Sequence, residues 1–337
     1  LTRSSAASDV YKRQHLGIVK ALFLGDKSSL EQEMRQSFSA AGAMHLLAIS
    51  GLHIGLFIWI IYGVFRFFSR LIRRNTALLF AFIFIWLYAY LIDFPPSVLR
   101  SVLMFSILSL GYFTRGIKNQ LNILFFSATV LLLVDPAYLL DIGYQLSYAA
   151  MLGIILCYNA LSSNIRFKKK PLTFLWNATA LCLSAQLFTF PICLYYFHQF
   201  PNYFILSNLG IVTLAGIIVG LGGAVIIFSQ LAFLAEKIAF LLSVLLSLLI
   251  TFIQWIENLP GSIAQGFILH EIELLLLFTC CAGVYWSLIY KRQRLISGIF
   301  GICACVIIAS NHNRQLSSKH LILFNTNRFS CALHMSN

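Results

Sequence analysis

Ten apolar segments follow one another along this 337-residue chain, separated by short polar connections. A helix needs about 20 predominantly apolar residues to cross the hydrocarbon core of a bilayer. Apolar residues make up 59% of the chain and charged residues only 10%, whereas about a quarter of the residues in a soluble domain are charged. We therefore predict an all-α polytopic membrane protein with about ten transmembrane helices. The segments lie near residues 44–65, 76–92, 97–113, 121–134, 144–161, 172–197, 203–229, 239–256, 272–290 and 295–310.

The basic residues fall in alternate connections between these segments. Fourteen Lys and Arg residues lie in or beside the connections at 66–75, 115–118, 166–170, 237 and 291–294, whereas 93–96, 135–143, 198–202 and 257–271 contain none. Cytoplasmic loops of membrane proteins carry an excess of Lys and Arg. We therefore expect the first set to face the cytoplasm and both termini of the chain to lie outside it. Most of the net charge of +13 is then an orientation signal rather than a DNA-binding face.

We expect the chain to have four regions. Residues 1–14 lack the apolar core of a signal peptide, and this leader could be a linker or a sequencing artefact. Residues 15–43 form an amphipathic extracellular-side segment, in which Leu30, Met34 and Phe38 recur at four-residue spacing, and we expect it to lie along the membrane surface. Residues 44–310 form the transmembrane domain, and residues 311–337 form a truncated extracellular-side tail.

The first transmembrane segment contains several residues that are unusual inside a membrane. His45, Ser50, Gly51 and His53 lie within the stretch AAGAMHLLAISGLHIG. Polar residues inside membranes are costly and are functional candidates by default. Backbone can leave the helical state only where it is buried in protein or borders water, so we predict a broken or re-entrant first span beside a pore. The alternative is close helix packing through small residues.

A second group of polar residues centres on Arg100, which follows Pro95 and Pro96 at the start of the third segment. The arginine should lie about one turn inside the outer end of a span that is otherwise free of charge. A functional role would place it in a polar vestibule, where it meets an anion. The alternatives are that it snorkels to the surface or forms a structural ion pair with Asp93 or Asp141.

A third group of polar residues lies where the next helix is expected to begin on the outer side of the membrane, in the sequence DPAYLLDIGYQLS. It comprises Asp135 and Pro136, followed by Gln145 and Ser147, which could face the same polar cavity. Asp141 is placed to cap the N-terminus of the following helix, because Asp side chains accept hydrogen bonds from the first backbone N–H groups. We predict that capping role for Asp141.

Four sequence blocks follow one another over roughly residues 20–230: GDKSSLEQEMRQSFSAAGAMHLLAISGLHIGL, PPSVLRSVLMF, DPAYLLDIGYQLSYAAMLGI and PICLYYFHQFPNYFILSNLGI. In sequence and in order they resemble the ComEC competence-protein family of DNA-uptake membrane proteins. The resemblance implies a bacterial inner-membrane channel core that passes single-stranded DNA into the cytoplasm during natural transformation. By position, the motif residues are His45, Ser50, Gly51, His53, Arg100, Asp135, Pro136, Gln145 and Ser147.

The resemblance also implies partners. These are single-stranded DNA, the lipid bilayer, and separate DNA-receptor and ATPase components, while a homodimer is left open. Family members commonly carry an OB-like domain and a metallo-β-lactamase-like nuclease domain. The chain contains no HxHxDH motif, no P-loop and no cluster of metal ligands in its sequence. We therefore expect no enzymatic activity, no cofactor and no metal site in this chain.

Two other classes of protein compete with the channel interpretation. A secondary transporter or flippase for a polar or anionic substrate would be favoured by paired carboxylates in mid-span, and the sequence shows none. An intramembrane serine protease would use Ser50 with a histidine. Ala48 stands where the first glycine of a GxSG motif would be, and His53 is only three residues from Ser50. From the residues alone, a channel or transporter for a polar substrate is favoured.

The charge pattern predicts the topology. A cysteine introduced at Lys169 should be protected from a membrane-impermeant thiol reagent added outside the cell, and one at Glu257 should be labelled, because only the first loop is basic. Labelling at 169 but not at 257 would contradict the assignment.

Overall fold

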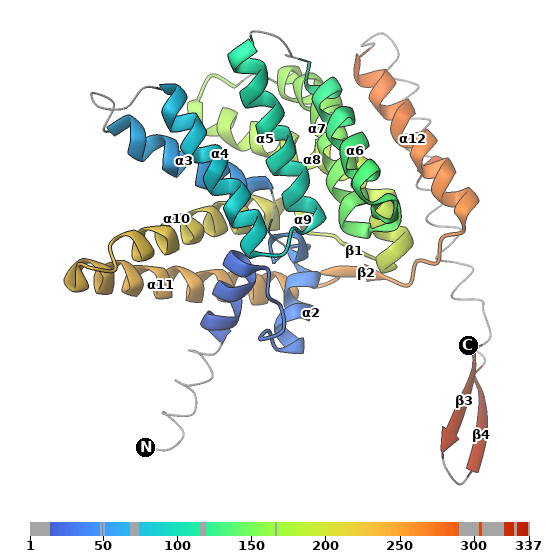
Figure 1. Cartoon of the computed structure of the whole chain (residues 1–337). Helices are drawn as coiled ribbons and strands as arrows, with labels where there is room; N and C mark the ends of the chain where they lie inside the picture. Colours follow the sequence, from blue (N-terminus) through green and yellow to red (C-terminus); the bar gives the residue numbers. More distant parts are fainter. Residues whose placement is uncertain are drawn as a thin grey trace, which may run out of the picture.

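The computed structural model describes residues 14–47, 49, 51–67, 74–114, 119–165, 167–289, 303–304, 320–326 and 329–335 (Figure 1). Helices dominate this part of the chain. After a first helix, Gln14–Leu24, they are α2 (Gln32–Ala40), α3 (Gly51–Phe67), α4 (Arg74–Leu91), α5 (Pro96–Thr114), α6 (Gln120–Val134), α7 (Ile142–Asn164), α8 (Lys170–Phe197), α9 (Phe204–Ser207), α10 (Thr213–Ile227), α11 (Ala232–Glu257) and α12 (Glu271–Ile289). The short 3-10 helices Met44–Leu46 and Pro136–Leu140 precede α3 and α7, and a π-helical turn, Asn208–Val212, joins α9 to α10.

Two short strand pairs complete the described elements. β1 (Gln199–Pro201) pairs antiparallel with β2 (Ile263–Gln265), with Phe200 opposite Ala264. β3 (His320–Thr326) pairs antiparallel with β4 (Phe329–Met335) near the C-terminus. The β1–β2 pair joins connections 198–202 and 257–271, both of which lack Lys and Arg. The pairing therefore agrees with the prediction that these two connections lie on one side of the membrane.

The length and composition of the helices confirm the predicted class, an α-helical multi-pass membrane protein. Five described helices are long and apolar enough to cross a membrane: Ile142–Asn164, Lys170–Phe197, Phe204–Ile227, Ala232–Glu257 and Glu271–Leu288. Four other described apolar helices are shorter. The count of about ten spans is not confirmed and stays a prediction, and segment 295–310 lies outside the described residues apart from 303–304.

The first predicted span is divided, as its glycines and polar residues indicated. The 3-10 helix Met44–Leu46 ends before residue 47, and α3 begins only at Gly51. A continuous helix over 44–65 would have buried the carbonyl of Ile49 inside a helical hydrogen-bond ladder. Instead, this carbonyl accepts a hydrogen bond of 2.8 Å from Ser97 Oγ at the start of α5. The break therefore provides a polar group with which α5 bonds.

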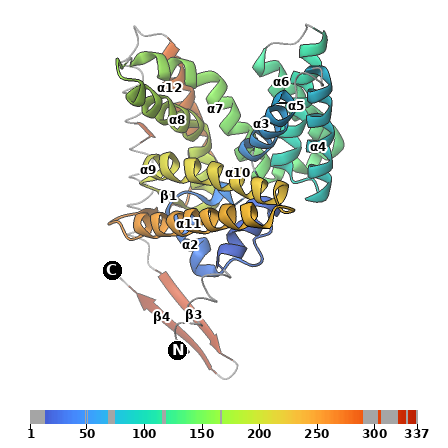
Figure 2. The same ribbon diagram turned by 90° about the vertical axis from the view of Figure 1, so that its left-hand side faces the viewer.

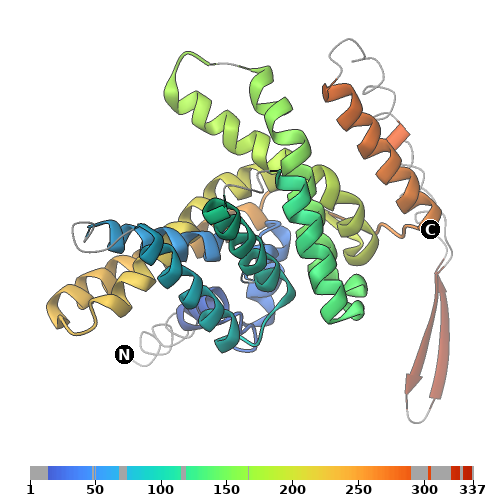
Figure 3. The same cartoon turned by 45° about the horizontal axis from the view of Figure 1, so that its top comes forward.

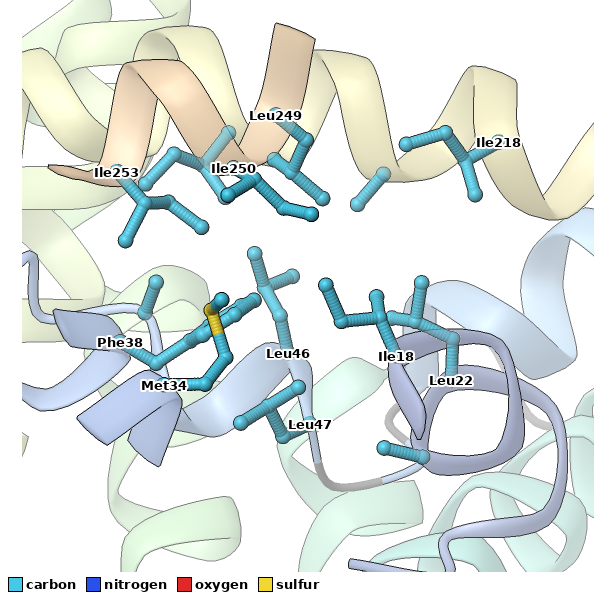
Figure 4. Close-up of a cluster of buried hydrophobic side chains, with 14 of the residues drawn as sticks. Ile18, Leu22, Met34, Phe38, Leu46, Leu47, Ile218, Leu249, Ile250 and Ile253 are labelled. Atoms are coloured by element: carbon cyan, nitrogen blue, oxygen red, sulfur yellow. The ribbon is translucent and has the colours of Figure 1, made fainter. Parts of the chain in front are cut away.

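The hairpin of α10 and α11 lies across the other long helices, whereas α12 lies at the edge of the bundle beside α7 and α8 (Figures 1, 2 and 3). On one side of the hairpin, Ile218, Leu249, Ile250 and Ile253 form a hydrophobic core with residues from the N-terminal segment (Figure 4). The residues contributed by that segment include Ile18, Leu22, Met34, Phe38, Leu46 and Leu47.

This core corrects one expectation about the amphipathic segment 15–43. Leu30, Met34 and Phe38 were expected to face lipid at the membrane surface, but they are 6%, 4% and 1% exposed and pack against protein. An amphipathic pattern establishes that one face of a helix is apolar, but not what covers that face. Here the crosswise α10–α11 hairpin covers it.

The contact between α7 and α8 should be sensitive to a single methyl group. A Cβ added to Gly153 of α7 would overlap the carbonyl oxygen of Ser184 in α8. Overpacking of this kind costs about 1–3 kcal/mol, more than the ~0.5–1 kcal/mol that alanine gains over glycine in a helix. Gly153→Ala should therefore lower the thermal unfolding temperature in detergent.

The matched control for this substitution is Gly220→Ala in α10, where an added Cβ would have no atom within 4 Å. Its unfolding temperature should stay the same or rise slightly. Equal unfolding temperatures for the two variants would contradict the close α7–α8 contact.

Candidate functional site

Arg100 lies in the second turn of α5, and its side chain is only 7% exposed. Its Nη1 donates a 3.3 Å hydrogen bond to the carbonyl of Ser147 in α7, and its Nη2 donates one of 3.3 Å to Ser101 Oγ. The guanidinium carbon lies 5.9 Å from the centre of the Tyr148 ring. The Nε atom is buried and has no hydrogen-bond partner. Within the described part of the chain, all contacts of this cation are with neutral groups.

The beginning of α3 packs against the same arginine. A Cβ on Gly51 would lie 3.3 Å from Arg100 Nη2 and 3.0 Å from Ser101 Oγ, so the absence of a side chain allows the two helices to approach. The first backbone N–H groups of a helix have no partner within that helix and carry partial positive charge. The N-terminus of α3 and the guanidinium of Arg100 therefore create positive potential at one place.

Three tyrosines connect Arg100 with the turn before α7. The ring centres of Tyr138 and Tyr144 are 6.4 Å apart, and those of Tyr144 and Tyr148 are 4.5 Å apart. The Tyr148 hydroxyl lies 3.1 Å from Ser127 Oγ of α6. The Tyr144 hydroxyl donates a 3.3 Å hydrogen bond to the carbonyl of Ala128 in the same helix. The ring beside Arg100 is thus fixed by bonds to α6 and by its aromatic neighbours.

The structure brings together three of the predicted site residues, Gly51, Arg100 and Ser147. Ser147 contributes its backbone carbonyl. His53 is 2% exposed in α3, and His45 Nδ1 lies 3.1 Å from the carbonyl of Gly42. Ser50 is outside the described residues, so its predicted place in the site stays a prediction.

The remaining predicted residues lie in the turn before α7 or in the first turn of α7, and their described hydrogen bonds are with groups other than Arg100. Asp135 Oδ1 accepts a 2.9 Å hydrogen bond from the backbone N–H of Ala137, and Pro136 begins the short 3-10 helix. Gln145 Nε2 donates to the carbonyl of Leu139 at 2.9 Å. Asp141 Oδ1 accepts a 2.7 Å bond from Tyr144 N–H, which confirms its predicted role as an N-cap.

The geometry decides between the alternatives that the sequence left open for Arg100. The side chain does not snorkel to the surface, since it is nine-tenths buried. Among the described residues it forms no ion pair with Asp93 or Asp141, because Asp93 is exposed at a turn and Asp141 caps α7. Removing a charge from water costs several kcal/mol unless it is paired. A buried cation with only neutral partners is therefore suited to meet an anion that is not part of the chain.

Three residues of this site were not among the sequence predictions: Ser97, Ser101 and Tyr148. Ser97 and Ser101 are four residues apart in α5, and Ser101 Oγ donates a 2.9 Å hydrogen bond to the carbonyl of Ser97. Tyr144 and Tyr148 are likewise four apart in α7. This spacing, which places residues on one helix face, was the available signal. The sequence does not show that these two faces meet at Arg100.

No group of three or more His, Cys, Asp or Glu side chains that could hold a metal ion occurs among the described residues. Of the described cysteines, Cys157, Cys280 and Cys281 are buried and free. The elements of the site are therefore a cation, a helix N-terminus and neutral polar groups.

The fold and this site define a multi-pass α-helical membrane protein with an unneutralised cation inside its bundle. Residues 22–294 match the family model described as competence protein. The chain belongs to the competence protein family, and the resemblance drawn from the four sequence blocks is confirmed.

Three curated relatives support this assignment. ComE operon protein 3 of Bacillus subtilis is 34% identical over 303 residues, which cover 86% of this chain and 37% of the relative. Competence protein ComA of Neisseria gonorrhoeae is 30% identical over 42% of this chain and 21% of its own length. Recombination protein 2 of Haemophilus influenzae is 28% identical over 54% of this chain and 24% of its own. The matched part of the chain thus spans between 21% and 37% of the length of these relatives, and no solved structure matches the chain.

Because Arg100 has no carboxylate partner among the described residues, the effect of removing its charge on stability can be predicted. Burying a charge costs several kcal/mol, which an apolar side chain of similar length avoids, whereas removing one member of a buried ion pair costs about 3–5 kcal/mol because the other member is left unpaired. Arg100→Met should therefore leave the amount of folded protein in the membrane unchanged or raise it. Fluorescence-detected size exclusion of the solubilised protein measures this amount. A large loss of folded protein would contradict this prediction and would show that the contacts of Arg100 with Ser147, Ser101 and Tyr148 stabilise the fold.

Proposed function

We propose that this chain is the channel core through which single-stranded DNA passes into the cytoplasm during natural transformation. The observation that carries the proposal is the buried guanidinium of Arg100, which has only neutral partners and lies beside the N-terminus of α3. Helix N-termini and arginine side chains are the groups that proteins use to bind phosphate. The family relationship supports a DNA substrate in place of another anion.

A channel must bind its substrate well enough to admit it and weakly enough to release it. A carboxylate partner would cancel the charge of Arg100, and a full set of short hydrogen bonds would leave no donor for a phosphate. The two 3.3 Å hydrogen bonds of this side chain are long, and its Nε is unused. A phosphodiester group can therefore take over these donors without breaking strong bonds, and can leave again at low cost.

The proposal includes an orientation and a set of partners. We place the chain in the bacterial inner membrane, with loops 66–75 and 162–171 in the cytoplasm and both termini outside, because of the alternation of basic connections. The DNA receptor and the ATPase that drives entry are separate chains. We assign the transport path to this chain and no enzymatic step.

DNA uptake in a naturally competent host tests this proposal, with a chromosomal copy of each variant and uptake divided by the amount of protein in the membrane. Arg100→Met should reduce normalised uptake by at least about ten-fold, because one bond from a charged group contributes about 1.5–3 kcal/mol. Arg100→Lys should give an intermediate result, since it keeps the charge but loses the planar fork. Lys237→Met, which removes an exposed cation in α11, is the control and should take up DNA normally.

If normalised uptake by Arg100→Met equals that of the unchanged protein, Arg100 does not meet the substrate and the site proposed here is wrong. If Lys237→Met loses uptake as strongly as Arg100→Met, the loss reflects the overall charge of the protein. The site proposed here is then also wrong.

A further inference from the structure

A row of three glycines and one tryptophan runs along α3. Gly51, Gly55, Trp59 and Gly63 recur at every fourth position of this helix, and residues four apart lie one above the other on a helix surface, in a row that is inclined to the helix axis. The row therefore consists of bare backbone at three positions and one indole ring. We refer to these four residues as the α3 stripe.

The α3 stripe begins at the candidate site. Gly51 is the residue whose Cβ position lies 3.3 Å from Arg100 Nη2. Arg100 is nine-tenths buried, with an Nε that has no hydrogen-bond partner. A cation without a counter-ion among the described residues thus lies at one end of the stripe, which distinguishes this row of glycines from an ordinary helix-packing surface.

Beyond Gly51 the stripe is open. A Cβ on Gly55 or Gly63 would meet no atom within 4 Å, and Trp59 between them is 72% exposed. The other sides of α3 are occupied, since Ile54 packs in a core with Ile85 and Val98, and Phe57 packs edge-to-face on Tyr88 at 4.9 Å. These packing contacts of α3 thus lie away from the stripe, and the space beside Gly55 and Gly63 is unfilled.

Contact with lipid explains the position of Trp59 poorly. Tryptophan collects at the two membrane–water interfaces, where the ring is half wet. Trp59 is the ninth of the 17 residues of α3, about 12 Å along the helix from Gly51 at a rise of 1.5 Å per residue. It therefore lies near the middle of the helix, with a bare glycine one turn away on each side.

We propose that the α3 stripe is the surface along which a single nucleic-acid strand lies, with a phosphate at Arg100 and a base stacked on the ring of Trp59. Proteins that bind single strands without sequence preference combine a positive charge for the backbone with aromatic rings for the bases. Gly55 and Gly63 leave room on both sides of the ring for the strand to approach the helix. This inference rests on the proposed function, since it names the part of the channel that contacts the bases.

The experiment compares four variants in the uptake assay described above, again normalised to protein in the membrane. Trp59→Leu should reduce uptake by about ten-fold, the order of effect expected when one base–aromatic stack is removed. Trp59→Phe keeps an aromatic face and should restore most of the uptake. Gly55→Leu should block passage because its side chain fills the open space. Trp255→Leu, which removes a half-exposed tryptophan from α11, is the matched control and should behave normally.

A second measurement detects the contact itself. A single strand containing 5-bromodeoxyuridine, arrested in the channel by a bulky 3′ group and irradiated, should form a crosslink in the α3 peptide that contains Trp59. The crosslink should disappear in Trp59→Leu and persist in Trp255→Leu.

The outcomes separate this inference from the proposed function. If Trp59→Leu takes up DNA normally and no crosslink forms in α3 while Arg100→Met still blocks uptake, the chain is the channel but the α3 stripe faces lipid, and the inference is overturned. If Arg100→Met also takes up DNA normally, the proposed site fails together with the stripe.

Discussion

The guanidinium of Arg100 lies inside the helical bundle where three helices meet, and its partners among the described residues are all neutral. Ser147 of α7 supplies a carbonyl, Ser101 of α5 a hydroxyl and Tyr148 of α7 a ring face. Gly51 at the start of α3 provides the space that the side chain needs. A carboxylate in any of these places would cancel the positive potential of the guanidinium. Neutral hydrogen-bond partners thus allow the guanidinium to be buried while its charge stays unneutralised by the described residues.

The break before α3 is held by α5, the helix that carries Arg100. An interrupted helix exposes backbone groups, which are costly inside a membrane unless other protein groups satisfy them. The bond from Ser97 Oγ to the carbonyl of Ile49 satisfies one of these groups and attaches the break to α5. Below the break, the N-terminal segment packs on the crosswise α10–α11 hairpin through Phe38, Leu46 and Leu47. The start of α3 is therefore fixed by a polar contact with α5 and by this apolar core.

Sequence reasoning succeeded where a pattern has a local cause. Apolar length placed the spans from α4 to α12 within about three residues, except that α11 begins at Ala232, seven residues before the predicted start. The glycines predicted the break before α3. The N-cap role of Asp141 followed from its position before Tyr144, because capping involves residues only three apart. The same reasoning treated the apolar face of α2 as lipid-facing, because burial depends on a hairpin more than 170 residues away. It also missed Tyr148, because the contact between α7 and α5 cannot be recognised from any single position in the sequence.

The sequence by itself determined that this chain is a helical membrane protein, which family it belongs to, and which residues are expensive to place in a membrane. These properties depend on composition, local spacing and the order of motifs, all of which can be read along one dimension. Only the tertiary structure decided that Arg100 has neutral partners among the described residues instead of Asp93 or Asp141, and that the space beside Gly55 and Gly63 of α3 is unfilled. Charge pairing and open space are relations between segments far apart in the chain, and packing alone sets them.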